Sequence, residues 1–486
     1  MTTRGRQRAV LAAALVTVLT AAPTAAATPP VDPRALPTAD PIGPDEPTEQ
    51  RTACATVAEA EFPTVPPPAQ RDLRFADVWH LTRGAGQLVA VIDTGVARHP
   101  SLPGLRAGGD YVDATGDGTQ DCDAHGTVVA GLIAARDDAS SGFAGGAPDA
   151  RVLSIRQSSS AFAAVRSEPD AEDGSTSSGY GNVDTMARAV VAAADAGATV
   201  VNISEVACAR AGSPLGDSAL GAAVRYAAVE KDVVVVAAAG NLDGRRCRDR
   251  NDVVRGPQAD DAPVRTVASP AWFDDYVLTV ASVDPDGRPS AFTLGGPWVD
   301  VAAPGTGIVS LSPTGRGSAT GTIDADGRVL PFDGTSFAAP FASATAALVR
   351  SRFPSLTAPE VIDRIVRTAH APAGGVDTAV GYGTLDPVAA VTSTATDATR
   401  QAASRPLPAV SVDPPPDRRA AVLAVSAAGA CALLVALVSA LRALRRQRPT
   451  DALRRQRPTD ALRRQRPTDA LRRQRPGDAA SSGGPS

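Results

Sequence analysis

The strongest constraint on the fold is an alternation of short, continuously apolar runs with alanine-rich runs between about residues 73 and 391. Continuous β-branched runs are typical of strands that are buried on both faces of a sheet. Strands that alternate with helices favour an α/β fold, in which helices cover both faces of a parallel sheet. We expect strands at Leu88–Ile92, Val152–Ile155, Thr199–Ile203, Val233–Ala238, Val277–Ala281 and Val299–Ala302. We expect helices at Gly126–Ala135, Val183–Ala196, Gly216–Lys231, Ser336–Arg352 and Pro359–Thr368.

Four reactive side chains fall where such a fold places its active site, beyond the carboxyl ends of the strands. Asp93 and Asn241 each follow a predicted strand, and His125 and Ser336 each open a predicted helix. A serine hydroxyl becomes a good nucleophile when a histidine takes its proton and a carboxylate fixes the histidine tautomer. An amide donor can stabilise the oxyanion that then develops. We therefore predict Asp93, His125 and Ser336 as a catalytic triad and Asn241 as the oxyanion donor.

The four residues lie in recognisable sequence blocks, and the chain order Asp, His, Ser is that of subtilisin-type proteases. The blocks are VAVIDTGV (89–96), HGTVVAG (125–131), AAAGN (237–241) and DGTSFAAP (333–340). On these blocks the chain resembles the subtilisin-like serine proteases of peptidase family S8. The resemblance implies a subtilisin-like fold and an endopeptidase that works through an acyl-enzyme intermediate. We expect no cofactor.

Further segments narrow the resemblance to the mycosins, the membrane-anchored subtilases of actinobacterial type VII secretion systems. These segments are CDAHGT (122–127), SIRQSSSAF (154–162), VVNISEVAC (200–208), GPWVDVAAPG (296–305), TAHAPAGG (368–375) and GYGTLDPVAAV (381–391). The resemblance implies cleavage of a protein that a type VII system exports, and association with the secretion membrane complex. Two alternatives stay open. The chain could mainly stabilise that complex, with proteolysis dispensable, or it could be a general cell-surface subtilase.

In subtilisins, the segment after the Asn-x-Ser strand is usually glycine-rich and hydrogen-bonds the peptide substrate. Here it reads Ser204, Glu205, Val206. We expect these three residues to bind substrate, with Val206 narrowing the first specificity pocket and Glu205 adding charge. The departure from glycine predicts a protease of restricted specificity.

Four of the five cysteines lie in the part of the chain that we expect to be exported. An even number of cysteines in an oxidising compartment predicts two disulfides, for which three pairings are possible. The mycosin pattern implies the pairs Cys54–Cys122 and Cys208–Cys247. The separations of these cysteines do not resemble a zinc site.

Five aspartates crowd the stretch before His125. Calcium stabilises many subtilases, but the spacing of these residues fits no calcium loop that we can name. We therefore expect a solvated acidic loop and no metal site. The residues are Asp110, Asp113, Asp117, Asp121 and Asp123.

Both ends of the chain address it to a membrane. Three arginines, an apolar run and the small residues Ala25–Ala27 predict a secretory signal peptide over residues 1–27. Residues 420–441 carry no charge and are long enough to cross the hydrocarbon core as one transmembrane helix. The arginine-rich residues 442–486, in which ALRRQRPTD recurs, predict a cytoplasmic tail by the positive-inside rule. We thus expect a single-pass protein of the cell membrane with an extracytoplasmic catalytic domain.

The remaining segments predict linkers around one catalytic domain, residues 73–391. Residues 28–72 are rich in proline and should wrap around the domain or dangle, and we expect them to stay attached after signal cleavage. Residues 392–419 resemble an extended stalk, and the polar residues 158–181 an exposed insertion loop. The formal net charge is only −4, and no aromatic residue interleaves the arginines of the tail, so we expect no nucleic-acid partner.

Overall fold

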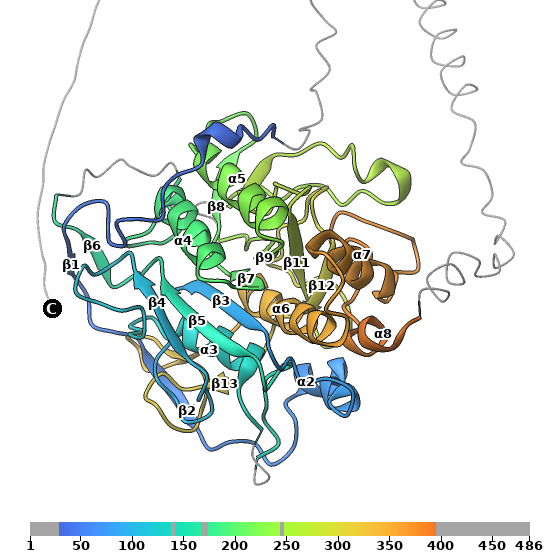
Figure 1. The fold of residues 1–486 in the computed structure, drawn as a ribbon, viewed down its shortest axis with the longest axis horizontal. Coiled ribbons are helices and arrows are strands. Elements are labelled where there is room, and N and C mark those ends of the chain that lie inside the picture. The colour runs from blue at the N-terminus through green and yellow to red at the C-terminus, as the bar shows by residue number, and fades with distance from the viewer. Residues whose placement is uncertain (1–28, 138–140, 167–173, 244–246, 395–486) are drawn as a thin grey trace, which may run out of the picture. The chain divides into compact units, whose positions relative to one another are not determined.

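The computed structural model describes residues 29–137, 141–166, 174–243 and 247–394 (Figure 1). The predicted signal peptide, transmembrane helix and arginine-rich tail, and nearly all of the predicted stalk, lie outside these ranges. In the part of the chain that is described, no helix is long and apolar enough to cross a membrane.

A seven-stranded, fully parallel sheet forms the centre of the molecule, with the strand order β12-β11-β9-β7-β3-β5-β4. All six predicted strands are present, with ends within two residues of the predicted ones, so the parallel α/β sheet is confirmed. The strands are β3 (Leu88–Asp93), β4 (Arg106–Asp110), β5 (Arg151–Arg156), β7 (Val200–Ile203), β9 (Val234–Ala238), β11 (Val277–Val283) and β12 (Val301–Pro304).

Helices cover both faces of this sheet, as predicted (Figure 1). Along β3, Val89 and Val91 pack with one set of helices, whereas Leu88, Ala90 and Ile92 pack with the other. Successive side chains of a strand point to opposite faces, so a continuously apolar strand contributes to two cores. One face carries α3 (His125–Ala134), α6 (Thr335–Arg352), α7 (Ala358–Thr368) and α8 (Pro387–Thr392); the other carries α4 (Val183–Asp195) and α5 (Ser218–Arg225).

Two details of the central layers differ from the sequence-based expectation. The helix expected over Gly216–Lys231 is α5 followed by the π-helical turn η3 (Tyr226–Glu230). The edge strand β4 was not predicted, because its sequence RAGGD lacks an apolar run. It pairs with β5 only, with an irregular register between Ala107 and Asp110.

The predicted N-terminal extension wraps around the domain through main-chain hydrogen bonds. Its strand β1 (Thr48–Gln50) pairs with β6 (Phe162–Ala164), and its strand β2 (Thr56–Ala60) pairs with β14 (Ser318–Ile323). The other elements of the described chain are α2 (Pro68–Leu73), η1 (Pro33–Ala35), η2 (Phe75–Val78), η4 (Gly256–Gln258), β8 (Ala207–Arg210), β10 (Thr266–Ser269), β13 (Ser310–Leu311) and β15 (Val329–Pro331).

The expectation that residues 158–181 form an exposed loop was wrong for much of the described part of that segment, although Ser160, Val165 and Ser178 are exposed. Ser158, Ser159 and Thr176 are at most 3% exposed, and Tyr180 is 5% exposed. Ser159 and Tyr180 exchange two main-chain hydrogen bonds of 2.9 Å, which pair the two arms of the segment. A polar sequence can be buried where its groups find hydrogen-bond partners, and composition alone does not reveal those partners.

Replacing Phe341 by alanine is expected to destabilise the fold by about 3–5 kcal/mol, because Phe341 is fully buried in α6 and its removal leaves a cavity. Its ring stacks against Phe75, with 6.1 Å between centroids. Urea unfolding of the purified protein measures the change. Val229→Ala is the control, since Val229 is 56% exposed. Equal unfolding free energies for the two variants would contradict this assignment of the core.

Candidate active site

The predicted catalytic residues meet at the carboxyl edge of the central sheet. Asp93 is the last residue of β3, and Asn241 comes three residues after β9 ends. His125 is the first residue of α3, and Ser336 is the second residue of α6. Because the strands are parallel, their carboxyl ends lie at one edge, and the helix N-termini that follow face the same edge.

Two hydrogen bonds join Asp93, His125 and Ser336 into one chain. His125 Nδ1 lies 2.7 Å from Asp93 Oδ1, and His125 Nε2 lies 2.9 Å from Ser336 Oγ. Asp93 is fully buried, and its Oδ1 also accepts the Thr94 N–H at 2.7 Å. With the proton on Nδ1 directed at Asp93, the imidazole presents Nε2 as an acceptor to the Ser336 hydroxyl.

The Asn241 side chain is held so that its amide nitrogen can donate into the site. Its Oδ1 accepts two hydrogen bonds from Thr335, from N–H at 2.9 Å and from the hydroxyl at 3.0 Å. Since both Thr335 groups donate, the oxygen must face them, and Nδ2 takes the other side. A Cβ placed on Gly334 would lie 2.8 Å from Ser336 Oγ and 3.1 Å from Asn241 Nδ2. The hydroxyl and the amide donor therefore converge above Gly334, where a side chain would intrude.

Asp121 ties together the two segments that carry Asp93 and His125. Its carboxylate accepts the Thr94 hydroxyl at 2.9 Å, and both the N–H and the hydroxyl of Thr127, at 2.8 and 2.5 Å. Desolvation raises the pKa of Asp121 to about 6, although these hydrogen bonds act in the opposite direction. In the sequence, Asp121 is one of several aspartates before His125, and nothing in that run predicts that it bonds to Thr94 and Thr127.

The acidic run before His125 is not a solvated loop throughout, which corrects the prediction. Asp110 is 2% exposed and lies 3.5 Å from the Arg156 guanidinium. Asp123 accepts hydrogen bonds from Ser159 and Ser160, including the Ser160 N–H at 2.8 Å. These carboxylates each have their own partners in the protein, because the run folds back on the domain instead of projecting from it.

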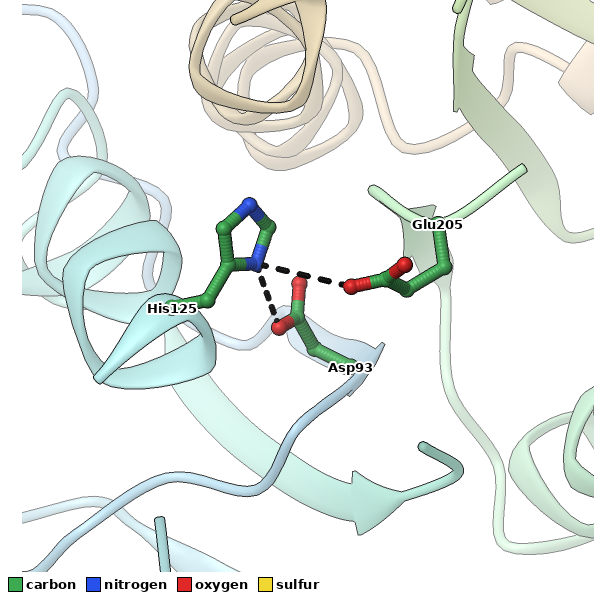
Figure 2. Close-up of side chains that lie close together, drawn as sticks. All are labelled: Asp93, His125 and Glu205. Carbon is green, nitrogen blue, oxygen red and sulfur yellow. Dashed lines mark hydrogen bonds and ion pairs between the residues drawn. The ribbon is translucent and has the colours of Figure 1, made fainter. Parts of the chain in front are cut away.

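The three predicted substrate-binding residues have different surroundings. The Ser204 hydroxyl donates to the main-chain oxygen of Ser336 at 2.9 Å, so a contact within the protein occupies its proton. Glu205 Oε1 lies 3.9 Å from His125 Nδ1 (Figure 2). Val206 packs beside Gly240, where a Cβ on the glycine would lie 3.6 Å from Val206 Cγ2.

A cavity of about 390 Å³ adjoins these groups. His125, Glu205, Val206, Asn241 and Ser336 all line it. Part of its lining comes from the segment that was expected to be an exposed loop. The lining residues from this segment are Ser160, Thr176, Ser177 and Ser178, of which only Ser160 lies in the block SIRQSSSAF.

The electrostatic surroundings favour a protonated His125. Burial alone lowers the pKa of His125, but the Asp93 carboxylate and its hydrogen bond, followed by the charges of Glu205 and Asp121, raise it to about 9. Figure 2 shows the two carboxylates of Asp93 and Glu205 directed at Nδ1.

The same three side chains could also offer ligands to a metal ion, since one ligand atom from each lies within 4.8 Å of the others. His125 Nδ1 is already bonded to Asp93, so the His–Asp pair explains the grouping. The absence of a metal site stays a prediction.

Two disulfides brace the surroundings of the site. Cys54 is paired with Cys122 and Cys208 with Cys247, the pairing that the mycosin resemblance implied. Cys122 precedes His125 by three residues, so the first bridge ties the N-terminal extension to the loop before α3. The second joins β8 to the chain that follows Asn241.

Known proteins share this sequence and fold. The model of the subtilase family matches residues 84–383. Mycosin-4 of Mycobacterium tuberculosis is 49% identical over 92% of this chain and 98% of its own length. The chain belongs to the mycosins, which are subtilases. It is a subtilisin-like serine peptidase, as the sequence predicted.

Solved mycosin structures agree with the fold. The MycP3 protease from the type VII (ESX-3) secretion system is 46% identical, covers 76% of this chain and all of its own, and has a TM-score of 0.70. A chain in the structure of an intact ESX-5 inner membrane complex is 39% identical, covers 86% of this chain and all of its own, and has a TM-score of 0.69.

Replacing Glu205 by glutamine is expected to lower the pKa of His125, because it removes a negative charge that favours the imidazolium. Only neutral imidazole can accept the Ser336 proton, so reactivity should rise with pH, with a midpoint near 9 in the unaltered protein. The midpoint should move to lower pH in Glu205→Gln. The rate of inactivation by diisopropyl fluorophosphate, followed across neutral and alkaline pH, measures it.

Asp326→Asn is the matched control, since it removes one negative charge from a side chain that is 70% exposed and belongs to the β14–β15 turn. Its midpoint should equal that of the unaltered protein. A midpoint in Glu205→Gln that stays in place or moves to higher pH would show that Glu205 does not act on His125.

Proposed function

We propose that this mycosin is a membrane-anchored serine endopeptidase with an extracytoplasmic active site, and that it processes a protein exported by a type VII secretion system. Ser336 is the nucleophile, His125 the general base, Asp93 the group that orients the histidine, and Asn241 the oxyanion donor. The observation that carries the assignment is the continuous hydrogen-bonded chain from Asp93 through His125 to Ser336 Oγ, with distances of 2.7 and 2.9 Å.

In the proposed reaction, Ser336 Oγ attacks the carbonyl carbon of the peptide bond while its proton passes to His125 Nε2. Asp93 stabilises the imidazolium that forms. The charge that develops on the carbonyl oxygen receives a hydrogen bond from Asn241 Nδ2, and loss of one such donor costs about 10²–10³ in rate. The imidazolium then protonates the leaving amine, which leaves an acyl group on Ser336. A water molecule, deprotonated by His125, releases the carboxylic acid and restores the hydroxyl.

The terminal segments of the sequence and the cysteines support the proposed compartment and anchor. A signal peptide over residues 1–27 and a span over 420–441 would leave the peptidase domain outside and the arginine-rich tail inside. Two disulfides within the domain suit an oxidising exterior. One solved relative belongs to an intact ESX-5 inner membrane complex, which supports a membrane partner of the same kind for this chain.

The specificity of the proposed peptidase is narrow because side chains stand where a glycine-rich segment would leave space. Val206 and Glu205 line the cavity together with Ser336, and residues of the 158–181 segment also line it. A substrate must therefore fit among side chains of both segments, and the charge of Glu205 lies beside the histidine. An exported protein with a defined cleavage segment suits such a site better than a broad mixture of proteins does.

Val206→Gly is expected to widen the range of peptides that are cleaved, because it opens the space beside Gly240 and Asn241. Cleavage of a peptide library by the purified protein, read by mass spectrometry, measures the range. The unaltered protein should leave casein largely intact. Broad digestion of casein by the unaltered protein would contradict restricted specificity. The control Val229→Ala changes a side chain that is 56% exposed and does not line the cavity, so this variant should cleave the same peptides as the unaltered protein.

The experiment that tests the proposed function compares the secreted proteins of cells that carry Ser336→Ala, a deletion of the gene, or the unaltered gene. With proteolysis as the main task, Ser336→Ala should leave a specific exported protein in its longer, uncleaved form. If secretion and processing are the same with Ser336→Ala but secretion fails on deletion, the main task is to stabilise the complex. If neither change alters a type VII substrate, the chain acts as a general surface subtilase.

A further inference from the structure

The helix that begins at Ser336 contains a proline at a position that affects Ser336 itself. In an α-helix, the carbonyl oxygen of each residue accepts a hydrogen bond from the N–H four residues later. The residue four positions after Ser336 is Pro340, which lies inside α6 and has no N–H. The regular helical partner of the Ser336 carbonyl is therefore missing.

A side chain from another element donates to this carbonyl. The Ser204 hydroxyl, just beyond the end of β7, lies 2.9 Å from the Ser336 oxygen. Ser204 is 5% exposed, so water has little access to the pair. The Ser204 hydroxyl, just after β7, thus provides the hydrogen-bond donor that α6 lacks at the Ser336 carbonyl.

Two further buried groups fix the direction of this hydrogen bond. Asn202 Nδ2 donates to Ser204 Oγ at 2.8 Å, and the Ser343 hydroxyl donates to Asn202 Oδ1 at 2.8 Å. Asn202 and Ser343 are both fully buried. Because an amide nitrogen can only donate, Ser204 Oγ must accept from Asn202, which leaves the Ser204 proton for the Ser336 carbonyl. The chain Ser343–Asn202–Ser204–Ser336 thus runs in one direction.

We infer that Ser204 is a positioning residue for Ser336, and that it replaces the helical N–H that Pro340 removes. The inference rests on the proposed role of Ser336 as nucleophile. The hydrogen bond holds the carbonyl of the residue whose Oγ must stay 2.9 Å from His125 Nε2. Without it, a buried carbonyl is unsatisfied and the first turn of α6 can relax. A misplacement of about 1 Å at a reacting group can cost as much as 10²-fold in rate.

The test uses diisopropyl fluorophosphate, which reacts with an activated serine whatever the peptide specificity. Ser336 Oγ bonds to phosphorus, fluoride leaves, and His125 takes the hydroxyl proton. Ser204→Ala is expected to slow this inactivation by about 10–100-fold, since it misplaces the nucleophile. Ser204→Thr keeps a hydroxyl and should recover most of the rate. Ser318→Ala is the matched control, because Ser318 is also buried and donates to main-chain oxygens, but in β14.

The decisive variant is the double change Ser204→Ala with Pro340→Ala, measured against Pro340→Ala alone. Alanine at position 340 restores an N–H four residues after Ser336, so the double variant should recover most of the lost rate without any hydroxyl at position 204. A merely structural defect from Ser204→Ala would not be repaired at Pro340. If Ser204→Ala does not fold, the double variant should restore folding and inactivation together.

Three results would overturn the inference. The first is an inactivation rate in Ser204→Ala within twofold of that of the unaltered protein, and the second is a double variant that reacts no faster than Ser204→Ala. The third is a Ser204→Ala variant in which only the KM for peptide substrates changes and kcat is unchanged. The last result would make Ser204 a substrate contact. Failure of the proposed function looks different, because diisopropyl fluorophosphate would then not modify Ser336 in the unaltered protein.

Discussion

The buried carboxylate of Asp93 is the interaction on which the rest of the site depends. A charge with no solvent exposure is costly unless hydrogen bonds and an opposite charge compensate it. Asp93 Oδ1 accepts hydrogen bonds from the Thr94 N–H and from His125 Nδ1–H. These bonds fix the distance between the end of β3 and the start of α3. The Asp121 carboxylate stabilises this arrangement, because it accepts hydrogen bonds from the Thr94 hydroxyl and from the Thr127 N–H in the first turn of α3.

The fold was largely predictable because a parallel sheet with two covered faces leaves a clear pattern. Strands such as β3 and β9 are apolar at nearly every position, and the side chains that follow them must lie at the carboxyl edge. Asp93, His125, Asn241 and Ser336 could thus be brought together from sequence alone. The edge strand β4 was not predicted. It has one neighbouring strand and contains two glycines, so its sequence lacks the continuous apolar run of the central strands.

The details that sequence could not provide are those in which a polar group has a partner far along the chain. Ser204 was predicted to contact substrate, which stays a prediction, and its hydroxyl donates to the main-chain oxygen of Ser336, 132 residues away. The sequence spacing does not reveal that Pro340 removes the helical donor of the Ser336 carbonyl, or that the Ser204 hydroxyl donates to that carbonyl instead. The segment 158–181 misled for a similar reason. Ser158, Ser159 and Thr176 are polar, yet all three are buried, and Thr176 Oγ1 accepts a hydrogen bond from Gln157 Nε2.

The N-terminal extension is joined to segments that form the site, both by strand pairing and by a disulfide. Strand β1 pairs with β6, which lies in the segment that lines the cavity, and Cys54 is joined to Cys122 just before His125. Cutting the chain near residue 75 would leave β1 and β2 held to the domain only by their main-chain hydrogen bonds and by the Cys54–Cys122 disulfide. Loss of these pairings would leave unpaired edges on β6 and β14, and unpaired strand edges favour aggregation. An extension that completes two small sheets is expected to stay attached, because its removal would leave β6, in the segment that lines the cavity, without its partner strand.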